Sequence, residues 1–204
     1  MLRTYDLLKR VVGLIRPTGP LCDLLTPEKY RELLAKGIRV VFASRMTLPS
    51  NFTNDDLVAI YWYTHQNTKP YTYKSLNAVM WGEPRPLKKE LLELSSHLTI
   101  ALEKLPPFNG VCWRTAVFDV TRQLAHPEGT VVQYPAFTST SSQNRKQPKN
   151  GGSYMVIMSS TGRDISGLSR FPNEAEILML PGTNFRILTN ELDSGTRVIL
   201  MEEV

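Results

Sequence analysis

Two glutamates offer the clearest opportunity for chemistry in this sequence. Glu174 and Glu176 stand one residue apart, directly before an apolar run, and Pro172 and Asn173 ahead of them are typical of a turn. Because side chains alternate along a strand, a strand that begins here would place both carboxylates on one face. Such a pair is either the acidic outer face of a solvated edge strand or part of a functional site.

An arginine and a run of hydroxyl side chains precede the glutamates. Arg114 lies in the middle of the apolar stretch 110–118, where it would form a structural ion pair, face outward on an edge strand, or anchor a phosphate or another anion. Ser139 and Ser141 alternate within the stretch 137–142, so on a strand they would project together. That stretch is either a polar strand end that runs into a loop or part of a site.

The order of these three features resembles the Arg–Ser–Glu class of mono-ADP-ribosyltransferases, which includes bacterial toxins and eukaryotic arginine-specific enzymes. The residues that carry the resemblance are Arg114, Ser139-Thr140-Ser141 and Glu174-Ala175-Glu176. The stretch 166–173 is similar to the substrate-recognition turns of the family, and 180–185 to its bend into the next strand. The resemblance covers roughly residues 54–204.

The resemblance implies a reaction that transfers ADP-ribose from NAD, the co-substrate, to an acceptor and releases nicotinamide. The C–N bond would break through an oxocarbenium-like transition state. Glu176 would stabilise that cation, Ser139 would orient Glu176, and Glu174 would hold the acceptor guanidinium and take its proton. A Glu rather than a Gln at the first position implies arginine acceptors. Phe171 would contact the acceptor.

The implied NAD-binding residues are Arg114, Thr115, Ser139, Thr140 and Ser141. Thr115 stands where the family often has glycine. The chemistry needs no metal, and His65, His97 and His126 are spread without ligand spacing. We therefore interpret the histidines as structural or surface residues.

The composition is that of an ordinary globular protein with a mild positive charge. The 204 residues carry a net charge of +5, which suits an anionic ligand, but the basic residues are scattered, so nucleic acid is an unlikely partner. Cys22 and Cys112 are each expected to be buried thiols, although one bridge between them stays open. There is no apolar stretch long enough to span a membrane and no standard secretion signal. We expect a soluble protein that works inside a cell or is delivered into one.

The hydrophobic pattern predicts helices in the first half and strands in the second, hence the α+β class. The predicted helices are a basic amphipathic one in 1–17, one from Thr26 that ends before Gly37, one from a cap at Asn54 to His65, and 73–81 and 87–105; 38–43 would be a short strand. The later strands are 110–119, 130–133, 136–140, 153–158, 175–180, 184–188 and 196–201, with a basic loop at 142–152.

This pattern, together with the resemblance, predicts a helical lobe followed by a mostly antiparallel, two-sheet β-core. The predicted division is an N-terminal extension (1–50), a helical lobe (51–107) and an NAD-binding core (108–204), with 51–204 as one domain. The leading function is protein-arginine ADP-ribosylation. The alternatives are an NAD glycohydrolase, an inactive binding module and, from the charge alone, a protein that binds or modifies nucleic acid.

Overall fold

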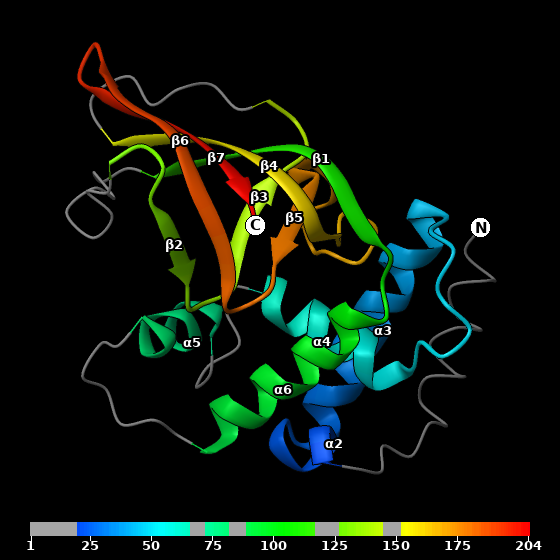
Figure 1. Cartoon of the computed structure of the whole chain (residues 1–204). Helices are drawn as coiled ribbons and strands as arrows, with labels where there is room; N and C mark the ends of the chain where they lie inside the picture. The colour runs from blue at the N-terminus through cyan, green and yellow to red at the C-terminus, as the bar shows by residue number, and fades with distance from the viewer. Residues whose placement is uncertain (1–19, 66–71, 82–88, 117–126, 145–151) are drawn as a thin grey trace. The chain divides into compact units, whose positions relative to one another are not determined.

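A computed structural model of the chain describes residues 20–65, 72–81, 89–116, 127–144 and 152–204 (Figure 1). The chain forms two compact units. The first contains the helices and the short segment 167–172, and the second contains the strands. The α+β class is confirmed. The finer division at residues 50 and 107, with 51–204 as one domain, stays a prediction.

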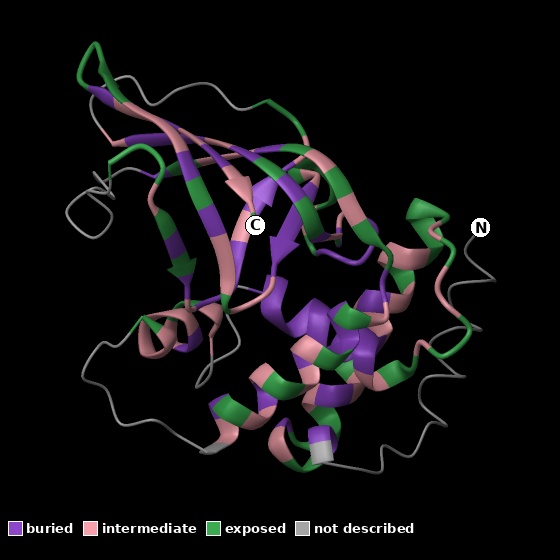
Figure 2. Cartoon of the chain, viewed as in Figure 1, coloured by how far each residue is buried: buried purple, intermediate pink, exposed green. Residues whose placement is uncertain are grey.

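The helical unit is built around α4 (Asn54–Thr64), which packs against both α3 and α6 and is buried along almost its whole length (Figure 2). The predicted apolar face of α6 is confirmed, since its leucines at 91, 94, 98 and 102 are at most 4% exposed. The other helices that the structure describes are α2 (Pro20–Leu24), α3 (Pro27–Ser44), α5 (Tyr73–Met80) and α6 (Lys89–Glu103).

The prediction that a helix ends before Gly37 and gives way to a strand at 38–43 was wrong. Helix α3 runs through Gly37 to Ser44 and ends at Arg45, which has a left-handed backbone (φ 56°). Gly37 faces α4, and a Cβ atom there would lie 2.9 Å from Leu57 Cγ. The glycine therefore allows two helices to pack closely and does not mark a helix end.

The start of α4 also differs from the prediction, because its cap is Thr53 rather than Asn54. Thr53 Oγ1 accepts a hydrogen bond from the Asp56 N–H (3.3 Å), and Asp56 Oδ2 accepts one from the Thr53 N–H (2.6 Å). This reciprocal pair is a capping box. Lys104 Nζ lies 2.7 Å from the same Asp56 oxygen and compensates its buried charge.

The seven strands of the described residues join one hydrogen-bonded sheet in the order β1-β3-β5-β4-β7-β6-β2, so the expected separation into two sheets is corrected. The pairs are antiparallel except β4 with β7. The sheets merge because β4 pairs with β7 along 153–158 and with β5 at 163–164, while β1 pairs with both β4 and β3. The strands are β1 (Pro107–Ala116), β2 (Val131–Tyr134), β3 (Thr138–Ser141), β4 (Ser153–Asp164), β5 (Glu176–Met179), β6 (Thr183–Asp193) and β7 (Thr196–Glu203).

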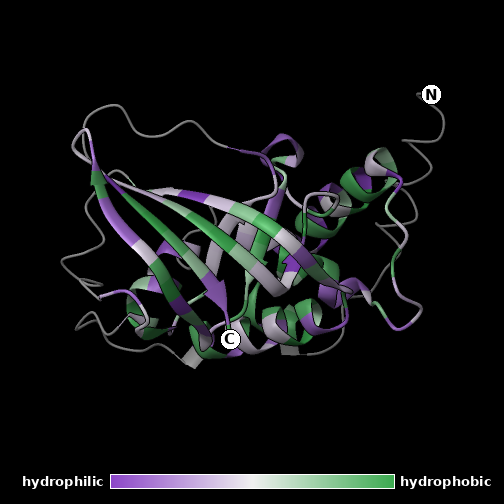
Figure 3. Ribbon diagram, turned by 45° about the horizontal axis from the view of Figure 1, so that its top comes forward, coloured by the Kyte–Doolittle hydropathy of each residue, from purple (hydrophilic) through white to green (hydrophobic). Residues whose placement is uncertain are grey.

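The core of the strand unit consists of apolar side chains from β1, β2, β4, β5, β6 and β7. The strands carry long hydrophobic stretches, while the β6–β7 hairpin is hydrophilic near its tip (Figure 3). Cys22 and Cys112 are both buried free thiols. The predicted helix in 1–17 and most of the basic loop lie outside the described residues. Within the described residues, no helix is long and apolar enough to cross a membrane.

Candidate active site

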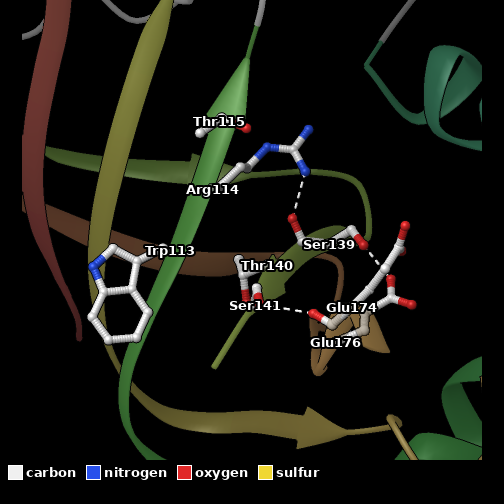
Figure 4. A pocket seen from close by; sticks show the side chains of 8 residues that line it. All are labelled: Trp113, Arg114, Thr115, Ser139, Thr140, Ser141, Glu174 and Glu176. Carbon is white, nitrogen blue, oxygen red and sulfur yellow. Dashed lines mark hydrogen bonds between the residues drawn. The ribbon is translucent and has the colours of Figure 1, made fainter. Parts of the chain in front are cut away.

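The predicted arginine, serine and glutamate residues meet in one cavity of the strand unit, of about 250 Å³ (Figure 4). Three segments supply its walls: the end of β1, the strand β3, and the turn that leads into β5. The lining residues are Trp113, Arg114, Thr115, Ser139, Thr140, Ser141, Glu174 and Glu176.

Arg114 and Ser139 are joined across the cavity wall. Arg114 Nη1 donates a hydrogen bond to the main-chain oxygen of Ser139 at 2.6 Å. The half-buried guanidinium therefore keeps donors beyond the one used here, and it adds the positive charge that an anion requires. Arg114 thus makes a structural hydrogen bond to a main-chain oxygen and also lines the cavity, while its role as an anchor for an anion stays a prediction.

Ser139 and Glu176 form the polar centre of the cavity. The Ser139 hydroxyl donates to Glu176 Oε1, and Glu176 is only 6% exposed. Burial raises the pKa of the Glu176 carboxyl to about 7; the hydrogen bond from Ser139 opposes this rise, the charge of Glu174 adds to it, and that of Arg114 opposes it. This carboxylate lies in a poorly solvated position, so an adjacent positive charge would stabilise it strongly.

Glu174 reaches the same cavity by a route that strand alternation did not predict. Strand β5 begins only at Glu176, while Glu174 is the last residue of the 3₁₀ turn η1 (Pro172–Glu174). Between them, Ala175 has a left-handed backbone (φ 45°). The expectation of two glutamates on one strand face was therefore wrong, although both carboxylates line one cavity. Glu174 is exposed and Glu176 is buried.

The remaining predicted NAD-binding residues divide by what their side chains do. Thr115 is exposed at the rim. Thr140 Oγ1 donates to Ile177 O at 2.7 Å, and Ser141 Oγ donates to Glu174 O at 2.7 Å, so both hydroxyls tie β3 to the segment that carries the glutamates. Ser139, Thr140 and Ser141 all line the cavity, so the common face expected for Ser139 and Ser141 stays a prediction.

Phe171 does not line this cavity, whereas Trp113, which the sequence reasoning did not select, does. Phe171 belongs to the segment of the helical unit at 167–172, where the Arg170 guanidinium lies 5.3 Å from its ring centre. Trp113 immediately precedes Arg114 and pairs with Ser141. Its position beside the strand arginine was the available signal. Among the described residues, no group of three or more potential metal ligands occurs.

Comparison with known proteins identifies the family of this chain. The family model described as NAD:arginine ADP-ribosyltransferase matches residues 29–204. The chain belongs to this family. The match starts well before residue 54 and so extends the resemblance into α3.

Relatives with related sequences are bacterial. The chain is 32% identical over 157 residues to the NAD(+)–protein-arginine ADP-ribosyltransferase Tre1 of Serratia proteamaculans, covering 77% of this chain and 34% of that protein. It is 33% identical over 116 residues to the putative NAD(+)–arginine ADP-ribosyltransferase Vis of Vibrio splendidus, covering 51% and 47%. The chain thus spans about a third to a half of the length of these two relatives.

Solved structures share the fold. The type III effector XopAI of Xanthomonas axonopodis pv. citri matches with a TM-score of 0.73 at 19% identity, covering 100% of this chain and 92% of that one. The structure of Vis in complex with agmatine matches with a TM-score of 0.62 at 22% identity, covering 93% and 88%. At these identities, the likeness supports the arrangement of helices and strands.

Proposed function

We propose that this chain cleaves NAD and transfers its ADP-ribose to the guanidinium of a protein arginine, releasing nicotinamide. The observation that carries the proposal is the buried Glu176, held by Ser139, in the same cavity as Arg114 and the exposed Glu174. Membership of the arginine-specific family and the glutamate at position 174 support arginine as the acceptor.

The cavity offers a group for each demand of the reaction. Arg114 supplies positive charge and free donors for the pyrophosphate of NAD. As the bond from C1 of the ribose to nicotinamide breaks, positive charge grows on the ribose, and the Glu176 carboxylate stabilises it. Nicotinamide leaves with the electron pair of that bond. Ser139 holds the carboxylate in place, so little reorganisation is needed as charge develops.

Glu174 acts on the acceptor. An arginine nitrogen carries no free electron pair for attack while the group is a protonated guanidinium, so a base must take a proton as the new C–N bond forms. Glu174 is an exposed carboxylate at the cavity, where an incoming arginine can reach it. The exposure also admits water, which favours NAD hydrolysis as a second activity.

The natural test is to separate cleavage from transfer. Nicotinamide release would be measured with NAD alone, and adduct formation with NAD and the small guanidine agmatine. We expect Glu174→Gln to lower adduct formation at least about a hundredfold with nicotinamide release largely kept, and Glu176→Gln to remove both. Glu191→Gln, at an exposed glutamate of β6, is the matched control and should change neither.

Three outcomes would contradict the proposal. Undiminished adduct formation by Glu174→Gln would show that Glu174 does not activate the acceptor. If the wild-type protein releases nicotinamide but forms no adduct, it is an NAD glycohydrolase. If it releases no nicotinamide, it is an inactive binding module. Labelling of a lysate with and without nuclease tests nucleic acid as an acceptor. We further propose that the protein acts where NAD is present, in the producing cell or in one into which it is delivered.

A further inference from the structure

The turn that carries Glu174 is held in a conformation that its sequence does not favour. Ala175 has a left-handed backbone (φ 45°), which an L-residue other than glycine, asparagine or aspartate rarely adopts. Ala175 lies between the last residue of η1 and the first residue of β5, and the glutamates on either side of it both line the cavity. Such a conformation persists only where the surroundings fix it.

The surroundings that fix this turn are the serines after Thr140. Ser141 Oγ donates to Glu174 O at 2.7 Å, a contact drawn in Figure 4. The main-chain N–H of Ser142 donates to Ala175 O at 2.9 Å, and its hydroxyl approaches the same oxygen at 3.3 Å. The Gln143 N–H donates to Ser141 Oγ at 3.1 Å and so directs the Ser141 hydroxyl hydrogen toward Glu174.

The serine run therefore acts on the two glutamates in different ways. Ser139 binds the carboxylate of Glu176 directly. Ser141 and Ser142 instead donate to the main-chain oxygens of the two residues before Glu176, which are Glu174 and Ala175. At the other end of the turn, the Ile165 N–H donates to Glu176 O at 3.0 Å, which anchors the start of β5 independently. A change at Ala175 or Ser142 would thus move Glu174 while leaving Glu176 anchored.

We propose that Ser142 and the left-handed Ala175 are positioning residues for the acceptor glutamate, and that they set how often ADP-ribose reaches arginine rather than water. The inference rests on the proposed function, in which Glu174 activates the acceptor. Neither residue touches the cavity, so their effect passes through the placement of Glu174.

The test is the ratio of two products made by the same protein, ADP-ribosyl-agmatine and free ADP-ribose, at fixed NAD and agmatine. Ala175→Val disfavours the left-handed backbone further, because a β-branched side chain crowds it. We expect the ratio to fall at least about fivefold, with nicotinamide release in the absence of agmatine within about twofold of wild type. Ala175→Gly keeps the conformation freely and should keep the ratio.

Ser142 gives a second, milder test. Ser142→Ala removes the hydroxyl contact but keeps the main-chain bond, so we expect the ratio to fall about twofold. Ser142→Thr retains the hydroxyl and should keep the wild-type ratio.

The matched control for Ala175→Val is Ser194→Val at the β6–β7 turn, where the backbone is also left-handed (φ 49°). It should lower the melting temperature about as much as Ala175→Val without changing the ratio.

The inference is overturned if Ala175→Val leaves the ratio unchanged, if Ser194→Val changes it equally, or if nicotinamide release falls by the same factor as transfer. A wild-type protein that releases nicotinamide but forms no agmatine adduct would instead overturn the proposed function, and the acceptor role of Glu174 with it. The two failures are distinguished by the wild-type measurement alone.

Discussion

At the scale of single residues, the cavity keeps a carboxyl group in a place that disfavours its charge. Glu176 is buried, and its pKa is raised to about 7. A carboxylate that is poorly solvated gains most when a cationic group forms beside it. The free protein therefore holds Glu176 at a cost in stability, as functional sites often do.

This cost predicts a pH-dependent gain in stability for Glu176→Gln. The folded pKa (about 7) lies above the ordinary value of 4.5, so the folded state binds the proton more tightly than the unfolded state. The contribution of Glu176 to stability is thus fully present below pH 4.5 and is lost as the pH rises through 7. A shift of this size corresponds to about 3 kcal/mol.

We expect Glu176→Gln to raise the free energy of unfolding by about 1–3 kcal/mol at pH 8 relative to wild type, with little of that gain at pH 4. Urea denaturation of both proteins at the two pH values measures the difference. Glu191→Gln, at the exposed glutamate of β6, again serves as the control. A gain at pH 4 as large as at pH 8 would show that the burial of the charge is not its cause.

At the scale of secondary-structure elements, the position of β5 depends on where β4 changes its neighbour. Glu203 of β7 accepts hydrogen bonds from the Thr161 hydroxyl, from the N–H groups of Thr161 (2.9 Å) and Ser160 (2.7 Å), and from the Ser159 hydroxyl (3.0 Å). Although burial opposes it, this set of donors lowers the pKa of Glu203. The carboxylate closes the end of the β4–β7 pairing, beyond which β4 pairs with β5.

The packing of α3 on α4 predicts an unusual response to a substitution at Gly37. In an exposed helix interior, Gly→Ala stabilises by about 1 kcal/mol. A Cβ at residue 37 would instead lie 2.9 Å from Leu57 Cγ, a side chain that is 4% exposed. We expect Gly37→Ala to destabilise the protein by about 1–3 kcal/mol, since overpacking exceeds the gain in helix propensity.

Thermal or urea unfolding of Gly37→Ala, Leu57→Ala and the double variant measures the coupling between the two positions. The cavity left by Leu57→Ala should accept the new methyl group, so the double variant should be more stable than the sum of the single changes predicts. Additive effects, or a stabilised Gly37→Ala, would contradict close packing at this point.

These examples show which features a sequence can reveal. The leucine repeat of α6 was predictable because a burial period is written within one segment. Arg114, Ser139 and Glu176, which line one cavity, could be selected because each stands in a short signature and the order of the signatures resembles a family. Gly37 misled the prediction because its reason is a contact with Leu57, 20 positions away. The left-handed Ala175 was not predictable, since it depends on hydrogen bonds from Ser142, which lies 33 positions earlier.

At the scale of the whole molecule, the cavity lies within one of the two units. All eight lining residues belong to the strand unit, whereas 167–172 belongs to the helical unit, where the Arg170 N–H donates to Thr64 Oγ1 (3.1 Å). The chain therefore passes from the strand unit to the helical unit after Ser166 and returns at Asn173, immediately before Glu174. The segment 166–173, which resembles the substrate-recognition turns of the family, thus contains residues of both units.

This arrangement predicts where bound NAD would be detected by hydrogen–deuterium exchange. A ligand that binds only the folded protein stabilises it by about 2.7 kcal/mol at a hundredfold excess over its Kd. With the non-hydrolysable analogue carba-NAD, we expect slower exchange at 113–115, 139–142 and 174–176, the segments that form the cavity and its serine contacts. Arg114→Ala removes the side chain that we propose anchors the pyrophosphate, and it should abolish this protection. Protection that persists in Arg114→Ala, or that spares all three segments in the wild-type protein, would show that NAD binds elsewhere.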